Sequence, residues 1–424
     1  MSNTLTTTSK FNPWLIVLGC FGCAQILITC LCNTAGMYFA PVMAEFGWEQ
    51  KQVALYTTIF SWVAAALQPL CGKIFQKVNA RILMLVVDVI FIAGYLWSAT
   101  FTHLWQWNTF GVIYGVTAGF FMYLANPIMV NRWFVKSKGM ALALISLIAG
   151  LLGFFWNPWV QNWINDYGWQ GARLRSGIIV GAISIVFTIL FIRNSPEDLG
   201  MKAYGADEAA KEAEKKETET VVLTGMTRAE AIKTPMFYLI AVVAFISCLT
   251  PSLNQQLSAY SSTVPIGAAA GAMALSILSI AGVIRGPVVG WCTDHLGALV
   301  TNCICCFLAA AGVFMIVIDG GVHVAVFYVG VTLFSLAFVP LTIGNPLMVS
   351  QVFGTKDYSN IYSIVTTIVL VSSGVAQYLY AAMRDATGSY EGVIILVGTL
   401  LCVQGVITPI IIAVDKKAKA KAAN

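Results

Sequence analysis

Apolar segments long enough to cross a lipid bilayer recur through most of this chain, and they constrain its fold more than any other feature. A bilayer core needs about 20 mostly apolar residues in a row. Twelve such runs can be marked, at approximately 14–39, 51–72, 82–101, 107–131, 139–163, 174–192, 236–261, 268–291, 299–318, 323–350, 359–383 and 392–414. Hydrophobic residues make up 58% of the chain and charged residues only 10%, which excludes a soluble protein of this length. We therefore predict an all-α membrane protein with twelve transmembrane helices.

The segment between the sixth and seventh runs is polar. Within it, Asp207–Thr220 alternates acidic and basic side chains, as solvated linkers do. We therefore expect residues 1–193 to form an N-terminal six-helix bundle, residues 194–234 a cytoplasmic linker, and residues 235–424 a C-terminal six-helix bundle.

Cytoplasmic loops carry an excess of Lys and Arg, which places both termini in the cytoplasm. All 24 Lys and Arg residues then lie on that side, apart from Arg285 inside a run and four on the outside, Lys51, Arg173, Arg175 and Arg384.

The two halves repeat each other at an almost constant offset. Asn-Pro-Ile-Met-Val at 126–130 closes the fourth run, and Asn-Pro-Leu-Met-Val at 345–349 closes the tenth. Pro-x-x-Gly at 69–72 and again at 287–290 ends the second and eighth runs. Repeats in the same membrane orientation indicate two bundles related by an axis along the membrane normal, with a substrate path between them at mid-depth.

The loops after the second and eighth runs resemble the G-x-x-x-D-R-x-G-R signature of the major facilitator superfamily. The first loop keeps Gly72 but has Gln76 in the acidic position, whereas the second keeps Gly290, Asp294 and Gly297. In that superfamily the loop is a cytoplasmic hinge where charge pairs hold one face closed. The resemblance therefore implies a twelve-helix major facilitator fold and a gating or hinge role for the two glycines, the aspartate and Gly297.

Two Asn-Pro pairs near the cytoplasmic ends of the fourth and tenth runs are further candidates for the gate. They are Asn126-Pro127 and Asn345-Pro346, and the repeat relates them to each other. Their position near the helix ends favours a hinge and gate role over contact with a ligand.

Within the superfamily, the sequence resembles the branch of oxalate–formate antiporters and monocarboxylate transporters. Residues 131–141, 193–205 and 227–237 carry this likeness, which implies transport of an organic anion. Members of the branch that handle dicarboxylates place a lysine on the eleventh helix. Here Thr366, Thr367 and Ile368 occupy that neighbourhood, so a single carboxylate fits better than a dianion.

Arg285 is the cation that would face such an anion. An arginine inside a membrane helix costs about 2.5–3.5 kcal/mol on insertion scales, so it normally faces a water-filled path or a partner. Alternatively, it lies close enough to the cytoplasmic end of its run to snorkel to the headgroups. The branch places its arginine one residue later, where Gly286 stands, which is about 100° around a regular helix. Both interpretations of Arg285 remain open from the sequence.

Polar side chains on other runs complete the candidate site. Gln25, Thr29 and Asn33 recur every four residues and therefore share one helix face. The alternative for such residues is hydrogen bonding between helices, and for Trp156 it is packing against lipid. The candidate substrate-binding residues are Arg285, Gln25, Thr29, Asn33, Gln68, Tyr123, Asn254, Gln255 and Trp156.

These features predict a secondary active transporter that moves a small organic anion, a monocarboxylate, across the cytoplasmic (inner) membrane by alternating access. The alternative is efflux of amphipathic or drug-like compounds by a proton antiporter, which the aromatic-rich runs would suit. Asp88 is a candidate proton carrier, but we expect it to pair with a nearby loop cation, so the coupling ion stays open.

The sequence also bears on partners. It has no nucleotide-binding loop of the form G-x-x-x-x-G-K-[ST], so ATP does not drive transport from within this chain. We expect no enzymatic activity, no cofactor, no metal site and no nucleic-acid partner. The expected partners are a small molecule, the lipid bilayer and, in the case of symport, protons. The family resemblance implies a monomer.

Overall fold

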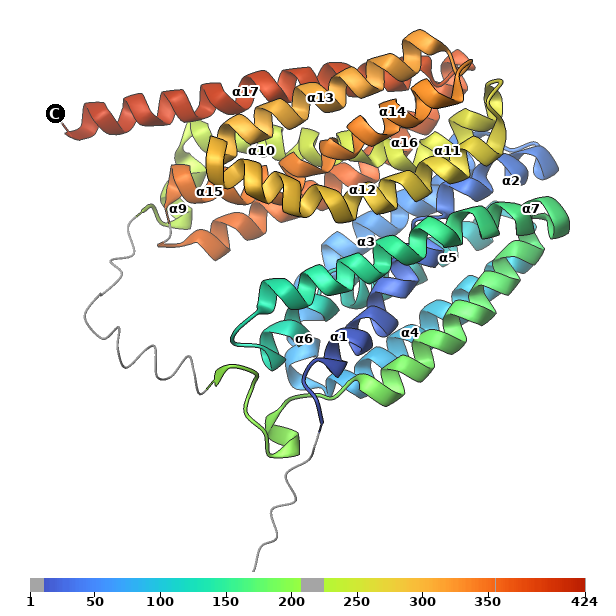
Figure 1. The fold of residues 1–424 in the computed structure, drawn as a ribbon, viewed down its shortest axis with the longest axis horizontal. Helices are drawn as coiled ribbons and strands as arrows, with labels where there is room; N and C mark the ends of the chain where they lie inside the picture. The colour runs from blue at the N-terminus through green and yellow to red at the C-terminus, as the bar shows by residue number, and fades with distance from the viewer. Residues whose placement is uncertain (1–10, 207–224, 355, 424) are drawn as a thin grey trace, which may run out of the picture.

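The computed structural model describes residues 11–206, 225–354 and 356–423, and every regular element in these ranges is a helix (Figure 1). The alternating charges predicted for the linker at Asp207–Thr220 fall outside the described residues. The N-terminal part contains α1 (Leu15–Cys20), η1 (Phe21–Gln25), η2 (Ile28–Cys32), η3 (Ala35–Tyr38), α2 (Phe39–Phe46), α3 (Gln50–Lys77), α4 (Ala80–Trp97), η4 (Ser98–Thr100), α5 (Leu104–Phe121), α6 (Ala125–Trp133), α7 (Lys138–Phe191) and η5 (Glu197–Leu199). The C-terminal part contains α9 (Arg228–Lys233), α10 (Pro235–Leu249), η6 (Thr250–Leu253), α11 (Asn254–Thr263), α12 (Gly267–Leu296), α13 (Ala298–Asp319), α14 (Val324–Phe334), η7 (Ser335–Phe338), η8 (Pro340–Gly344), α15 (Asn345–Phe353), α16 (Tyr358–Thr387) and α17 (Glu391–Ala423).

These helices match the twelve predicted runs. Ten stretches of the described chain are long and apolar enough to cross a membrane. One of them, Gly139–Phe191, has 53 residues and covers two runs, because Gly168 (φ 70°, ψ 173°) interrupts the helix between them. The second predicted run corresponds to α3, a helix of 28 residues. The prediction of an all-α, twelve-helix membrane fold is confirmed.

The helices form two groups that lie side by side (Figure 1). The largest hydrophobic core joins α1 to α7 and also includes Ala272, Leu275 and Ala381 of the other group, and two smaller cores hold α10 to α17 together. α6, α9 and α15 lie toward the same end of the molecule, which we call the linker end (Figure 1). The domain boundaries at residues 193 and 234 stay a prediction.

Four of the membrane helices are irregular in their middle. In the first, η1 and η2 are π-helical and η3 is a 3-10 turn. The fourth is interrupted between α5 and α6, the seventh contains the 3-10 segment η6, and the tenth contains η7 and η8. Proline explains two of these breaks, because Pro251 and Pro340 lack a backbone N–H.

The first and seventh helices approach each other very closely at Gly36. The backbone N–H of Gly36 donates to Gln255 Oε1 (3.2 Å), and a Cβ at position 36 would lie 2.0 Å from the Gln255 carbonyl oxygen. The two residues are 219 positions apart, which is the repeat offset of the Asn-Pro motifs. Each residue therefore contacts its own repeat counterpart, and the pseudo-symmetry axis passes through this contact.

Candidate functional site

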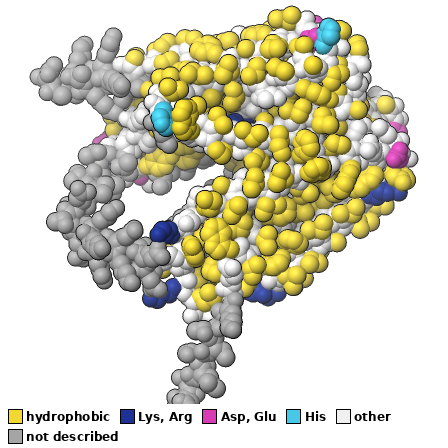
Figure 2. Space-filling view, in the orientation of Figure 1, with side chains coloured by type: hydrophobic (Ala, Val, Ile, Leu, Met, Phe, Trp, Pro, Cys, Tyr) yellow, Lys and Arg dark blue, Asp and Glu magenta, His cyan; other side chains and the backbone are white. Residues whose placement is uncertain are grey.

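The space between the two halves opens at the linker end. Figure 2 shows a hollow there, between the two halves, on the side where α17 and α9 end. Deeper in the molecule the halves pack against each other along two seams, α3 with α16 and α7 with α12. In the first seam the Thr58 hydroxyl donates to the Gly374 carbonyl (3.0 Å). In the second, Gly150 lies directly against Val283.

The end opposite the linker is closed by hydrogen bonds between the halves. The backbone N–H groups of Gln50 and Lys51, at the start of α3, donate to the two carboxylate oxygens of Asp385 on α16 (3.1 and 2.8 Å). The Gln50 side chain is fully buried, donates to Gln256 and accepts from the Tyr390 hydroxyl. A carboxylate at a helix N-terminus satisfies free N–H groups and the positive end of the helix dipole. We call these contacts the far-end latch.

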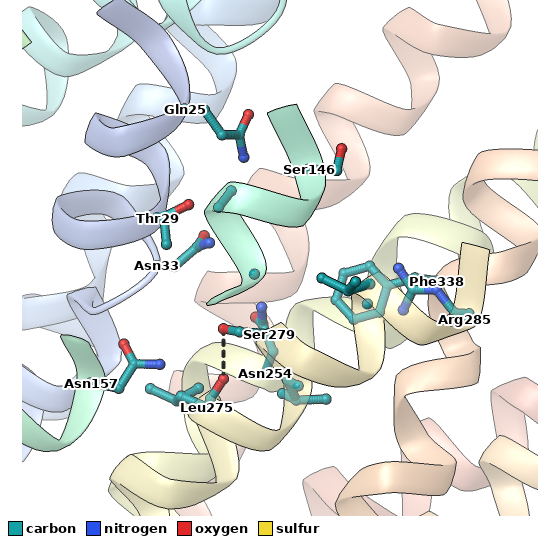
Figure 3. Close-up of a pocket in the computed structure, with 15 residues that line it drawn as sticks. Gln25, Thr29, Asn33, Ser146, Asn157, Asn254, Leu275, Ser279, Arg285 and Phe338 are labelled. Carbon is teal, nitrogen blue, oxygen red and sulfur yellow. Dashed lines mark hydrogen bonds between the residues drawn. The ribbon is translucent and has the colours of Figure 1, made fainter. Parts of the chain in front are cut away.

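The first cavity lies between the two halves and has a volume of about 330 Å³ (Figure 3). The irregular first helix contributes Gln25, Thr29 and Asn33 to its wall, so these three residues share a face as predicted. Asn254 comes from α11 and Arg285 from α12. The structure therefore brings together five of the nine predicted substrate-binding residues in one cavity.

Arg285 is the one charged side chain in the described lining of this cavity. Its guanidinium donates to the Ser335 carbonyl and lies over the Phe338 ring, 5.0 Å from the centroid. Arg285 also lines a third cavity of about 450 Å³ that extends along α7 to Met140, near the linker end. The helix that carries Arg285 is continuous through Pro287. The length of the arginine side chain, and not a distortion of the backbone, therefore brings its charge to the first cavity.

Several polar groups that line the first cavity have no hydrogen-bond partner among the described residues. The amides of Asn33 and Asn254 face the cavity without a hydrogen bond, and Asn157 Oδ1 is buried without one. Gln25 does have a partner, because Asn126 Nδ2 donates to its Oε1 (3.1 Å). Unsatisfied polar groups that point into a cavity favour a polar ligand or water there.

A second cavity, of about 270 Å³, adjoins the first and shares Asn33, Asn254 and Phe338 with it. Two further predicted residues, Tyr123 and Gln255, line this second cavity. None of the described side chains in its wall is charged.

The two remaining predicted binding residues lie elsewhere. Trp156 is buried, and its indole N–H donates to the Cys30 carbonyl (3.0 Å) in η2, so it supports the irregular backbone of the first helix. Gln68 lies on α3 beside Gly119 of α5, and its Oε1 is buried without a partner. Neither residue is among those that line the first or second cavity.

The predicted gate residues lie near the linker end or at helix breaks. Asn126 bonds Gln25, and Asn345 Nδ2 donates to the Ser247 hydroxyl (2.7 Å), so both repeats tie the Asn-Pro helix to the first helix of the same half. Pro127 is exposed and Pro346 half-buried. Gly72 and Gly290 have open space around them, Gly297 ends α12 with φ 82°, and the Asp294 side chain lies outside the described residues.

Sequence reasoning missed part of the site. On α12, Leu275, Ser279 and Gly282 share the face of Arg285 and line the first cavity. Their spacing of three to four residues was a usable signal. Phe338 lies in an apolar run with no signal that separates it from its neighbours.

Asp88 differs from its expected environment. Its Oδ2 accepts hydrogen bonds from the hydroxyls of Ser184 (3.1 Å) and Thr188 (3.0 Å) on α7, and the side chain is fully buried. The expectation of a loop cation as its partner is wrong, because Asp88 faces α7 within the bundle. It does not line the cavities described here.

Several known transporters are similar to this chain over most of its length. Monocarboxylate transporter 12 of Xenopus laevis is 24% identical over 404 residues, covering 91% of this chain and 85% of that protein. The Homo sapiens protein of the same name is 23% identical, covering 91% and 77%. An uncharacterized MFS-type transporter of Escherichia coli, YhjX, is 21% identical, covering 78% and 79%.

Solved structures show the same fold. The crystal structure of the nucleoside transporter NupG aligns with a TM-score of 0.68 at 12% identity, covering 94% of this chain and 98% of that one. The family model described as Major Facilitator Superfamily matches residues 21–413. This multi-pass membrane protein, with its two helix groups around a central cavity, therefore belongs to the major facilitator superfamily of transporters.

Proposed function

We propose that this protein is a secondary active transporter that moves a monocarboxylate across the cytoplasmic membrane by alternating access. Both termini and the linker are cytoplasmic in this proposal, and the halves 1–193 and 235–424 rock about the central cavity in a monomer. The relatives named monocarboxylate transporter 12 support the substrate class.

The observation that carries the proposal is the single charged side chain, Arg285, in the described lining of the first cavity. Arg285 has five N–H donors, and the described contacts use one of them on the Ser335 carbonyl. The others are available to a carboxylate, for which a guanidinium is the preferred planar partner. One cation compensates one negative charge, so a dianion would leave a carboxylate unpaired in a membrane-embedded site.

The open and closed ends support a cytoplasm-facing state. A substrate would enter from the linker end through the third cavity, which reaches Arg285, and meet the uncharged amides of Asn33 and Asn254 across the first cavity. Rocking of the halves would then open the far-end latch and close the linker end, which is the alternating access of this fold.

Uptake into proteoliposomes tests the proposal. Radiolabelled propionate and phenylacetate would be offered with and without an inward proton gradient to the wild type, Arg285→Gln and Arg285→Lys. Removing one partner of a desolvated charge pair costs about 2–5 kcal/mol, so we expect Arg285→Gln to lose at least 30-fold in uptake at low substrate. Arg175→Gln is the matched control, because Arg175 stacks on Tyr167 away from the cavities.

The outcomes separate the alternatives. Accumulation that depends on the proton gradient indicates symport, and exchange without it indicates antiport. Normal uptake by Arg285→Gln, or uptake of neither acid, would overturn the anion proposal. The efflux alternative draws support from the aromatic wall of the second cavity, and a deletion strain sensitive to amphipathic compounds would favour it.

A further inference from the structure

The second cavity has the walls of an apolar binding site. The rings of Phe60 and Tyr114 stack at 4.1 Å between centroids with an angle of 12°, and Tyr123 and Phe338 also contribute to the wall. Met122 adds an apolar side chain. Two polar residues of the wall are already engaged, since Ser252 donates to the Cys248 carbonyl (2.7 Å) and Gln377 bonds Gln256 and Ser252.

The size of this cavity also suits a ring. A protein cavity of about 150 Å³ lined by apolar side chains can bind benzene, and the second cavity has about 270 Å³. An acid of two or three carbons bound at Arg285 would leave this volume unused. Binding pockets usually combine apolar and aromatic walls with a few placed polar groups that fix the orientation of the ligand.

The junction of the two cavities joins the charged and the aromatic regions. Phe338 faces Arg285 from one side and lines both cavities. Asn33 and Asn254 also line both, and neither amide has a hydrogen bond within the described chain. A molecule that spans the junction would therefore place its anion in the first cavity, its polar linkage between the amides, and its body in the second cavity.

We propose that the second cavity binds the apolar, ring-sized body of the same substrate whose carboxylate pairs with Arg285, so that the protein carries arylalkyl monocarboxylates in preference to short-chain acids. This inference rests on the proposed function and adds a second subsite to it. Burying an aromatic side chain is worth about 1.5–3 kcal/mol, so phenylacetate should compete for the site about 10- to 100-fold better than propionate.

The test combines a competition series with a variant that fills the second cavity. Propionate, phenylacetate and the neutral phenylacetamide would compete for uptake of labelled phenylacetate. Ser373 lines only the second of the two cavities, so Ser373→Phe should weaken phenylacetate at least 10-fold and change propionate uptake less than twofold. Ser363→Phe, at an exposed position of the same helix, is the matched control for added bulk.

The failure of each proposal has its own signature. Equal competition by propionate and phenylacetate in the wild type, or an equal loss of both acids in Ser373→Phe, overturns the second subsite while Arg285 keeps its role. Uptake unaffected by Arg285→Gln overturns the proposed function instead. Phenylacetamide competing as well as phenylacetate would overturn the carboxylate pairing with Arg285, and with it the proposed function, because the apolar body alone would then carry recognition. The wild-type competition decides the matter even when Ser373→Phe does not fold.

Discussion

Replacing Asp385 by asparagine should open the far-end latch without disturbing the first cavity. The Asp385 carboxylate joins the two halves, because it lies on α16 and accepts the first two backbone N–H groups of α3. Asparagine keeps the shape of the side chain but retains only one acceptor oxygen and no charge. In the open state water replaces both contacts, so the substitution destabilises the closed latch selectively.

The loss of stability of the closed latch follows from the contacts that Asp385→Asn removes. A hydrogen bond to a charged group contributes about 1.5–3 kcal/mol, and a charge at a helix N-terminus adds about 0.3–1 kcal/mol. One bond and the charge are lost, and one neutral bond remains. We therefore expect a net shift of about 2 kcal/mol, which changes the ratio of closed to open molecules about 30-fold.

Electron-spin distance measurements between labels on α2 and α11 would report that ratio. Ala44 and Ser262 are exposed at the far end, one in each half, and a background without reactive native cysteines allows both to be labelled. Asp319→Asn is the matched control, because Asp319 also accepts two backbone N–H bonds, from Val322 and His323, but within one half. A change of less than threefold in the Asp385 variant, or an equal change in the control, would refute the reasoning.

Two further predictions follow from close contacts. Gly36→Ala should prevent the first and seventh helices from meeting, because its Cβ would lie 2.0 Å from the Gln255 carbonyl oxygen; the same spin labels should report a longer distance, and an unchanged distance with full uptake would contradict this. At the linker end, the backbone N–H of Arg228 and then the Asn360 amide hold the pKa of Asp357 below its usual range. Because the folded-state pKa is lowered, the stability that the Asp357 carboxylate contributes is complete above about pH 4 and is lost only as the pH falls through the folded-state pKa. Asp357→Asn should therefore speed hydrogen exchange in α9 at pH 7, whereas the wild type should keep its protection at pH 5.

The fold could be predicted because membrane helices leave a strong signal. Apolar length alone located the runs, including the one that forms α3. The positions of the irregular segments within the helices were harder to predict. The segments η1 and η2 contain no proline, and nothing in their residues distinguishes a π-turn from an α-turn.

The site was predictable at the level of helix faces but not of side-chain partners. Gln25, Thr29 and Asn33 share a face through simple spacing, and a regular helix was sufficient to bring Arg285 to the cavity. Trp156 was expected at the substrate but bonds the Cys30 carbonyl, and Asp88 was expected to meet a cation but meets two hydroxyls. Such partners depend on how neighbouring helices rotate, which one helix's sequence does not specify.

The solitary charge of the first cavity also determines where a transmembrane voltage can act. On the proposed mechanism, a bound carboxylate and Arg285 form a neutral pair, whereas the empty carrier keeps one positive charge in the cavity. Moving a full charge through 100 mV is worth about 2.3 kcal/mol, so a negative cell interior biases the empty carrier toward the cytoplasm and leaves the loaded carrier unaffected. Exchange of one acid for another, in which every crossing is loaded, would then be electrically silent, and net transport would depend on voltage at its return step.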